Sequence, residues 1–297
     1  MLFALQGRLE QQFGPASAAA IFKAFSIKRL PTLRANTLKI TDAQMMEHFR
    51  AQHIMFERVK GIPHAFIIKN KTSAELLETD FIKNGEGYLQ GLTSMLPALI
   101  LDAQPGETIL DLCAAPGSKT SQIAALIKNT GHIVACEKDF VRVQKLQHTL
   151  NLQGITNTEI LEGDAVLSLA RLGSETRFDR ILADVPCSAE GRIDLKNLRS
   201  YSFWSEKNII AHAKEQRRLL RAAMSALKPG GTLVYSTCTL APEENEQMIA
   251  WLCTEYPQLK EEAITLPLPS KKLSHGLAIL PSAQCEGFFV CKLKYAF

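Results

Sequence analysis

The sequence predicts an α/β fold in which a mainly parallel, Rossmann-like sheet is covered by helices on both faces. Short apolar runs alternate with helical stretches from Gly106 onward, and this alternation is typical of parallel sheets. The first 71 residues hold eleven Lys and Arg against four acids, although the whole chain has a net charge of only +4. We therefore expect three segments: an N-terminal α+β module at 1–71, a connecting segment at 72–105 and the main domain at 106–297.

The N-terminal module is expected to combine short helices with short strands. Arg8–Phe25 carries apolar residues at helical spacing, and Gly14-Pro15 divides the stretch into two helices. The other elements expected here are strands at Leu33–Lys39 and Ala65–Lys69 and a helix at Ala43–Gln52. Their basic residues suggest a polyanion such as nucleic acid as partner, and a solvated helix face explains the charge equally well.

The connecting segment is mostly polar at its start and apolar at its end. Lys71–Gly87 is expected to be a loop with one turn of helix at Ala74–Leu77. The second half of Tyr88–Leu101 is apolar and is expected to be a helix that leads into the main domain.

The main domain is expected to alternate strands and helices to its end. The expected strands are Thr108–Leu112, His132–Cys136, Glu159–Leu161, Phe178–Ala183, Thr232–Ser236, Leu277–Leu280 and Gly287–Leu293. The expected helices are Ser118–Lys128, Val141–Gln153, Lys207–Leu227, which ends before Pro-Gly-Gly, and Pro242–Glu255, which has proline at its start.

Composition excludes several classes of protein. Every apolar run is shorter than a membrane span, and Met1–Gln12 has no signal-peptide layout, so we expect a cytoplasmic protein without a membrane partner. The seven cysteines are scattered without zinc spacing, which indicates reduced thiols and no metal. No spare apolar stripe is evident, and a monomer is expected.

Three successive strand ends indicate a cofactor site. The first carries the small-residue loop of Asp111–Thr120, which lacks both G-x-x-x-x-G-K-S/T and G-x-G-x-x-G and so favours an adenosine ligand smaller than a dinucleotide. Glu137 ends the second strand and could accept from ribose hydroxyls, and Asp164 ends the third and could accept from the adenine amino group. The set fits S-adenosyl-L-methionine; taken singly, each acid could instead cap a helix.

Two further strand ends carry cysteines. Cys187 is the last residue of Asp184-Val-Pro-Cys, and Cys238 is the last residue of Ser236-Thr-Cys. Methylation of carbon 5 of cytosine needs a thiolate that adds at carbon 6 and a base that later removes the carbon 5 proton. Two thiols in one pocket could divide these tasks, while Asp184 bonds the polar edge of the base. A lone cysteine at a strand end would more often pack in the core than take part in catalysis. Two cysteines at the ends of neighbouring strands favour catalysis instead.

At these motifs the chain resembles the NOL1/NOP2/Sun family of S-adenosylmethionine-dependent RNA (cytosine-5) methyltransferases. The stretches that carry the resemblance are Leu110–Thr120, Asp184–Ser188, Lys228–Thr239 and Pro242–Glu246, with weaker matches at Leu33–Lys39, Gln90–Pro97 and Glu286–Val290. The resemblance implies a Rossmann-like class I methyltransferase domain with an RNA-recognition-like N-terminal module, and rRNA or tRNA as substrate.

The resemblance also implies roles for single residues. Cys238 matches the nucleophile, Cys187 the cysteine needed for product release, and Lys119 and Asp184 residues that contact cofactor and base. The residues that match the cofactor-binding set are Cys113, Ala114, Ala115, Pro116, Gly117, Ser118, Lys119, Glu137, Arg142, Asp164 and Asp184.

Three positions depart from the family pattern without removing a reacting group. Ser118 and Ala189 stand where glycine is usual, and Glu137 stands where aspartate is commoner. We expect RNA selection to depend on residues 1–71 and the pocket rim. Four basic residues of one long helix could add to that surface or simply be solvated: Lys214, Arg217, Arg218 and Arg221.

Two alternatives remain at this stage. In a DNA cytosine-5 methyltransferase, Cys187 would be the nucleophile and Cys238 incidental, but Ser188 replaces the glutamine usual after Pro-Cys. A non-catalytic RNA-binding or ribosome-assembly factor could use the same scaffold, although it would not need both cysteines, Lys119 and Asp184.

Overall fold

The computed structural model describes residues 1–173 and 177–296, so residues 174–176 and 297 of the main domain lie outside the described residues. Within the described part, the main sheet has nine strands in the order β11-β12-β13-β9-β8-β5-β6-β7, with β10 paired to β13. The strands are β5 Thr108–Asp111, β6 His132–Glu137, β7 Thr158–Glu162, β8 Phe178–Asp184, β9 Leu227–Thr237, β10 Leu259–Glu262, β11 Lys271–Lys272, β12 Leu277–Ile279 and β13 Phe288–Tyr295. Strands β5 to β9 pair in parallel, and β10 to β13 are antiparallel.

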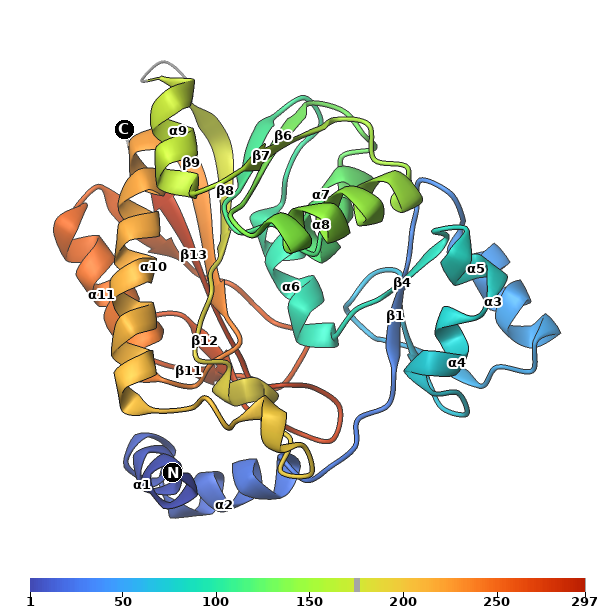
Figure 1. Ribbon diagram of the computed structural model, residues 1–297, viewed down its shortest axis with the longest axis horizontal. Coiled ribbons are helices and arrows are strands. Elements are labelled where there is room, and N and C mark those ends of the chain that lie inside the picture. Colours follow the sequence, from blue (N-terminus) through green and yellow to red (C-terminus); the bar gives the residue numbers. More distant parts are fainter. Residues whose placement is uncertain (174–176, 297) are drawn as a thin grey trace.

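Helices cover both faces of this sheet, as Figure 1 shows. The helices are α6 Leu92–Leu101, α7 Ser118–Leu126 and α8 Phe140–Gln153 on one face, and α9 Ala165–Leu172, α10 Glu206–Ala226 and α11 Glu246–Glu255 on the other. Neighbouring strand residues alternate between the faces: Leu110 packs toward α10, and Ile109 packs toward α6 and α7. The expected α/β fold class is confirmed.

A second, four-stranded antiparallel sheet forms a separate small unit with the order β2-β3-β1-β4. Its strands are β1 Thr32–Ala35, β2 Phe56–Arg58, β3 Ala65–Ile68 and β4 Gly87–Leu89, and α3 Asp42–Ala51, α4 Ser73–Leu77 and α5 Asp80–Lys83 accompany them. The buried rings of Phe49, Phe66 and Phe81 form its core. Strand β4 comes from the expected connecting segment, and the division of the chain at 71 and 105 stays a prediction.

The first two helices pack on the main domain and lie beneath α10 in Figure 1. They are α1 Leu2–Phe13 and α2 Pro15–Ala24, separated at Gly14 and Pro15 as the sequence predicts. Buried residues such as Leu9 and Ile21 belong to one cluster with Ile193, Trp204 and Leu240. The N-terminal segment therefore stabilises the loops that follow β8 and β9.

The single helix expected at Pro242–Glu255 is wrong. The 3₁₀ turn Pro242–Glu244 precedes α11, and Asn245 interrupts the helix with φ −116° and ψ −109°. The buried Asn245 side chain accepts from Thr237 Oγ1 at 2.6 Å and donates to the Thr239 carbonyl at 3.1 Å. These bonds to the end of β9 hold the turn in a non-helical conformation.

The turn of helix expected at Ala74–Leu77 is confirmed as α4, but the rest of the expected loop at Lys71–Gly87 is wrong in part, because it contains α5 and the start of β4. Thr72 and Glu75 form a capping box that starts α4. Helix α9 and strands β2, β10 and β11 are further elements that the sequence reading missed. In the described part of the chain, no helix combines the length and apolar character needed to cross a membrane.

Candidate active site

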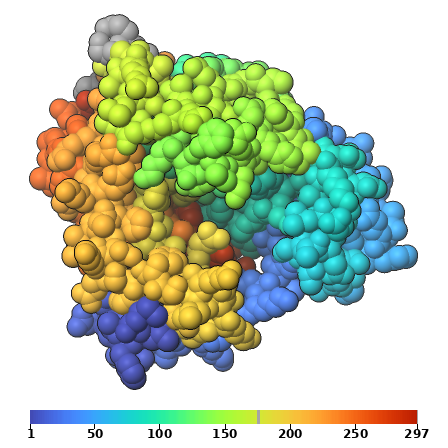
Figure 2. Space-filling model, in the orientation of Figure 1, coloured from blue at the N-terminus to red at the C-terminus, as the bar shows by residue number. Residues whose placement is uncertain are grey.

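The parallel strands bring the motif residues to one edge of the sheet. Because β5, β8 and β9 are neighbours and run in the same direction, their carboxyl ends open into one cavity. This cavity has a volume of about 460 Å³ and is lined by Asp111, Lys119, Asp184, Cys187 and Cys238, among others. Figure 2 shows a central hollow on this face, with red atoms from the C-terminal part at its floor.

The two motif cysteines face each other in this cavity. Their Sγ atoms lie 3.3 Å apart, at hydrogen-bonding distance for thiols. The hydrogen bond to Cys238, together with burial, raises the pKa of Cys187 well above its ordinary value. The pair therefore favours a protonated Cys187.

Lys119 and Asp184 form an ion pair beside the thiols. The Lys119 Nζ lies 2.7 Å from Oδ2 of Asp184 and donates to Ser94 Oγ at 2.8 Å. Ser236 Oγ donates to the other carboxylate oxygen, Oδ1, at 2.7 Å. The Asp184 side chain keeps 26% of its surface exposed, so the carboxylate still faces the cavity.

Asp111 also lines the cavity, although no role was predicted for it from the sequence. It is 1% exposed, and Thr120 Oγ1 donates to its Oδ2 at 2.7 Å. Its Oδ1 is buried without a hydrogen-bond partner among the described residues. Burial raises the pKa of Asp111 to about 6. A buried, unpaired carboxylate oxygen at this position suits a ligand that brings a donor or a positive charge.

The small-residue loop after β5 lies against α8. Gly117 has φ +101°, and a Cβ there would meet Leu146 at 3.0 Å and Thr149 at 3.1 Å. Ser118, at the position of the family's second glycine, begins α7 and meets no such restriction. The remaining loop residues, Cys113, Ala114, Ala115 and Pro116, line the cavity together with Ser118.

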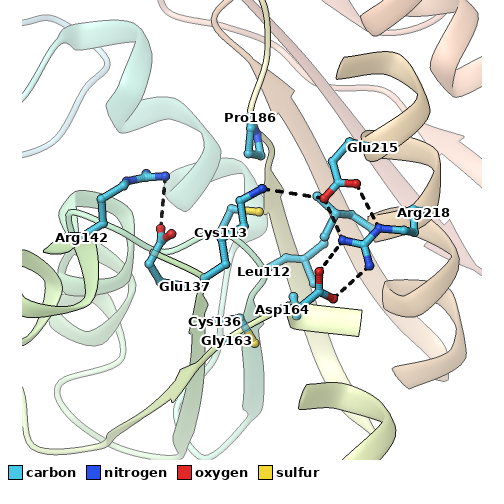
Figure 3. Close-up of a pocket in the computed structure, with 13 residues that line it drawn as sticks. Leu112, Cys113, Cys136, Glu137, Arg142, Gly163, Asp164, Pro186, Glu215 and Arg218 are labelled. Atoms are coloured by element: carbon cyan, nitrogen blue, oxygen red, sulfur yellow. Dashed lines mark hydrogen bonds and ion pairs between the residues drawn. The ribbon is translucent and has the colours of Figure 1, made fainter. Parts of the chain in front are cut away.

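A second, smaller cavity adjoins the first and shares Cys113, Arg142 and Pro186 with it. Its volume is about 30 Å³, and Glu137 and Asp164 line it as well. Figure 3 shows Glu137 and Arg142 joined on one side and Asp164 beside Arg218 on the other. Arg142 also donates to the Ala115 carbonyl at 2.6 Å, so it connects Glu137 to the small-residue loop.

Asp164 has partners that the sequence did not indicate. Both carboxylate oxygens accept from the guanidinium of Arg218, which lowers the pKa of Asp164. Its Oδ1 also accepts from Val166 N at 3.0 Å and caps α9. Asp164 lies at the cavity as expected, and it also has the capping role weighed as the alternative.

The basic residues of α10 are mostly engaged within the chain. Arg218 binds Asp164 and Glu215, and Arg221 binds Glu255 at 2.7 Å. The guanidinium groups of Arg217 and Arg221 lie over the Trp251 ring at 5.3 and 5.1 Å. These contacts give Arg217, Arg218 and Arg221 a structural role, whereas an RNA contact by this helix stays a prediction.

Ala189, at the other glycine position of the family pattern, has φ +57° and ψ +28°. The left-handed conformation costs a residue with a Cβ about 1–2 kcal/mol. Ala189→Gly removes this cost but gives the unfolded chain more freedom, which offsets about 0.4–1 kcal/mol. We expect a net gain of about 0.5–1 kcal/mol in the free energy of unfolding.

Urea denaturation measures this gain, with Ala222→Gly on α10 as the matched control. A glycine within a helix destabilises by about 1 kcal/mol. Equal losses for both variants would contradict strain at Ala189.

Among the described residues, no group of three or more His, Cys, Asp or Glu side chains is placed to hold a metal ion.

The family model for 16S rRNA methyltransferase RsmB/F matches residues 98–294. The chain is 38% identical over 275 residues to the ribosomal RNA small subunit methyltransferase F of Cronobacter sakazakii, covering 89% of this chain and 56% of that protein. The protein of the same name from an Escherichia coli O7:K1 strain is also 38% identical, with the same coverage. The chain thus spans about half the length of the curated relatives that it matches.

Solved structures share the fold. A methyltransferase homolog protein from Pyrococcus horikoshii superposes with a TM-score of 0.86 at 29% identity, covering 99% of this chain and 94% of that one. NSun6 from Pyrococcus horikoshii, solved with SFG, has the same TM-score at 23% identity and covers 99% of this chain and 98% of that one.

Proposed function

We propose, because the chain belongs to the 16S rRNA methyltransferase RsmB/F family, that it methylates carbon 5 of a cytosine in RNA. The resemblance to NOL1/NOP2/Sun methyltransferases is thereby confirmed at the level of the family. The observation that carries the proposed reaction is the approach of Cys187 and Cys238 to 3.3 Å beside the Lys119–Asp184 pair.

The two adjoining cavities fit S-adenosyl-L-methionine as methyl donor. Glu137 offers an almost fully buried carboxylate for ribose hydroxyls, and Asp111 Oδ1 offers an unpaired acceptor near the thiols. The bound cofactor would supply an electrophilic methyl group. The side chains that would hold it are those of the small-residue loop with Glu137, Arg142 and Asp164, while Lys119 and Asp184 line the first cavity together with the cysteines.

Cys238 is proposed as the nucleophile. Its thiolate adds to carbon 6 of the cytosine, which makes carbon 5 an enamine carbon able to accept a methyl cation. The Asp184 carboxylate, held by Ser236 and Lys119, would accept a hydrogen bond from the amino group of the base. After methyl transfer, loss of the carbon 5 proton lets the bond between carbon 6 and sulfur break and releases Cys238 as a thiolate.

Cys187 is proposed as the base of that release step. At rest, its hydrogen bond to Cys238 favours the thiol form. Once Cys238 becomes a thioether, it can no longer carry a negative charge, so one cause of the raised pKa of Cys187 is removed while burial still acts. For the release step, Cys187 would lose its proton to solvent and take the proton from carbon 5.

Small-subunit rRNA is the proposed substrate, since this is what the names of the curated relatives specify for those proteins. A cytoplasmic location is proposed with it, because ribosomal RNA would be met there. The monomeric state expected from the sequence stays a prediction.

The test of the proposed activity is incorporation of radiolabelled methyl groups from S-adenosylmethionine into small-subunit rRNA, tRNA and DNA. We expect incorporation into the rRNA, with 5-methylcytosine as the product after digestion. Methylation of DNA alone would favour the DNA enzyme, and binding of RNA without any methylation would favour a non-catalytic factor.

Glu137→Gln is expected to weaken S-adenosylmethionine binding. Its carboxylate would accept from ribose hydroxyls, and a hydrogen bond to a charged group contributes about 1.5–3 kcal/mol, or about tenfold to a hundredfold in affinity. Isothermal titration calorimetry measures the dissociation constant. Glu159→Gln on the adjacent strand is the control, because Glu159 pairs with His132 outside the cavity. Equal affinities for wild type and Glu137→Gln would contradict the ribose contact.

A further inference from the structure

Cys187 and Cys238 lie on separate loops, and the residues that follow them are joined by a hydrogen bond. Ser188 Oγ and Thr239 Oγ1 are 2.7 Å apart. Both side chains are buried, at 3% and 0% exposure. This bond fixes the two loops against each other one residue beyond the reacting sulfurs.

Glu244 and Gln216 hold the residues on either side of Cys187. Glu244 Oε2 accepts from the backbone N–H of Ser188 at 3.1 Å, and Oε1 accepts from the Ser188 hydroxyl. Gln216 Nε2 donates to Glu244 Oε2 at 2.7 Å and to the Pro186 carbonyl at 2.9 Å. Glu244 and Gln216 are both fully buried, at 0% exposure.

Burial raises the pKa of Glu244 to about 7, while the bonds from Ser188 and Gln216 favour its ionised form. The Ser188 hydroxyl contacts both Glu244 Oε1 and the Thr239 hydroxyl, and Thr239 Oγ1 lies 3.3 Å from Glu190 Oε2. Tyr235 also holds the 3₁₀ turn Pro242–Glu244, because its hydroxyl donates to the Glu244 carbonyl at 2.6 Å. An amide at position 244 carries no negative charge, so its bonds to Ser188 and Gln216 are weaker than those of the carboxylate.

We propose that Ser188, Thr239, Gln216 and Glu244 form a clamp that holds Cys187 at Cys238, with Glu244 as a positioning residue for the release step. The role of the clamp in the reaction rests on the proposed function. Its effect on the distance between the Cys187 and Cys238 sulfur atoms does not. Loss of the clamp moves Cys187 away from Cys238 and from the carbon 5 proton, and displacement of a catalytic group by about 1 Å can slow a step up to a hundredfold.

The first measurement needs no RNA. Diamide, a thiol oxidant, takes two electrons and two protons from a thiol pair, and one S–S bond of about 2.05 Å forms. Peptide mapping by mass spectrometry follows the Cys187–Cys238 link in the intact chain. We expect Glu244→Gln to slow its formation about tenfold or more. Glu243→Gln is the matched control, because Glu243 is the adjacent glutamate and pairs with Arg8 at 2.7 Å.

The second measurement follows the release step on denaturing gels with RNA and S-adenosylmethionine. Glu244→Gln is expected to accumulate a covalent protein–RNA adduct, as is expected for Cys187→Ala, whereas Glu243→Gln should not. A structural defect alone would lower adduct formation and turnover together. Ser188→Ala removes the hydroxyl that bonds Thr239 and Glu244 but keeps the backbone N–H bond to Glu244. It should give a smaller effect in the same direction, and it replaces Glu244→Gln in both measurements if that variant does not fold.

The outcomes separate the clamp from the proposed function. An unchanged crosslinking rate in Glu244→Gln overturns the clamp. Slower crosslinking with normal release overturns its role in the reaction. Absence of any adduct in Cys187→Ala counts against the proposed reaction, and the crosslinking rates then still decide whether the clamp exists.

Discussion

Cys238→Ala is expected to abolish methyl transfer while S-adenosylmethionine binding remains unchanged. Without a thiolate at carbon 6, carbon 5 of cytosine is too weak a nucleophile, and loss of a nucleophile lowers turnover by roughly four orders of magnitude or more. The substitution removes only a sulfur at the cavity wall, so the cofactor residues keep their contacts. Methyl incorporation and calorimetry measure the two properties.

Cys253→Ala is the control for this result. Cys253 is a half-buried cysteine on α11, outside both cavities. It should retain full activity. Substantial methyl transfer by Cys238→Ala would show that another group attacks carbon 6.

Cys187→Ala is expected to trap the enzyme on its RNA. Addition by Cys238 and methyl transfer can still proceed, but the thiol proposed to take the carbon 5 proton is gone. Turnover should fall by roughly two to four orders of magnitude, the range typical of a positioned general base. A slowly migrating protein–RNA species on denaturing gels measures the adduct.

The double variant Cys187→Ala/Cys238→Ala tests the origin of that species. It should form no adduct, because the attacking sulfur is gone. If the double variant still forms the species, the bond does not involve Cys238. If Cys187→Ala turns over normally, the base is another group.

The meeting of the two cysteines could be predicted from the sequence because it depends on local patterns. The apolar runs before Asp184 and Cys238 indicate buried parallel strands, and β8 and β9 are neighbours with Asp184 opposite Ser236. Cys187 follows the end of β8 by three residues and Cys238 follows the end of β9 by one, so parallel pairing alone brings them together. The same logic placed Lys119 and Glu137 at this edge of the sheet.

The partners of buried polar groups could not be predicted in this way. Asp164 meets Arg218, and Glu244 meets Ser188 and Gln216, across separations of 54, 56 and 28 residues. No periodicity in a single sequence specifies such pairs. The motif Pro242–Glu246 was visible, yet it reads as the start of a helix until the Asn245 side chain is seen bonding the end of β9.

The most direct test of the central claim is to identify the sulfur that bonds to the RNA. In RNA with 5-fluorocytosine at the target position, carbon 5 carries no proton to lose, so the methylated adduct cannot break down. Digestion and mass spectrometry then locate the nucleotide on the chain. The account predicts a bond to Cys238 alone; a nucleotide attached to Cys187 would contradict it and assign the attack to the other thiol.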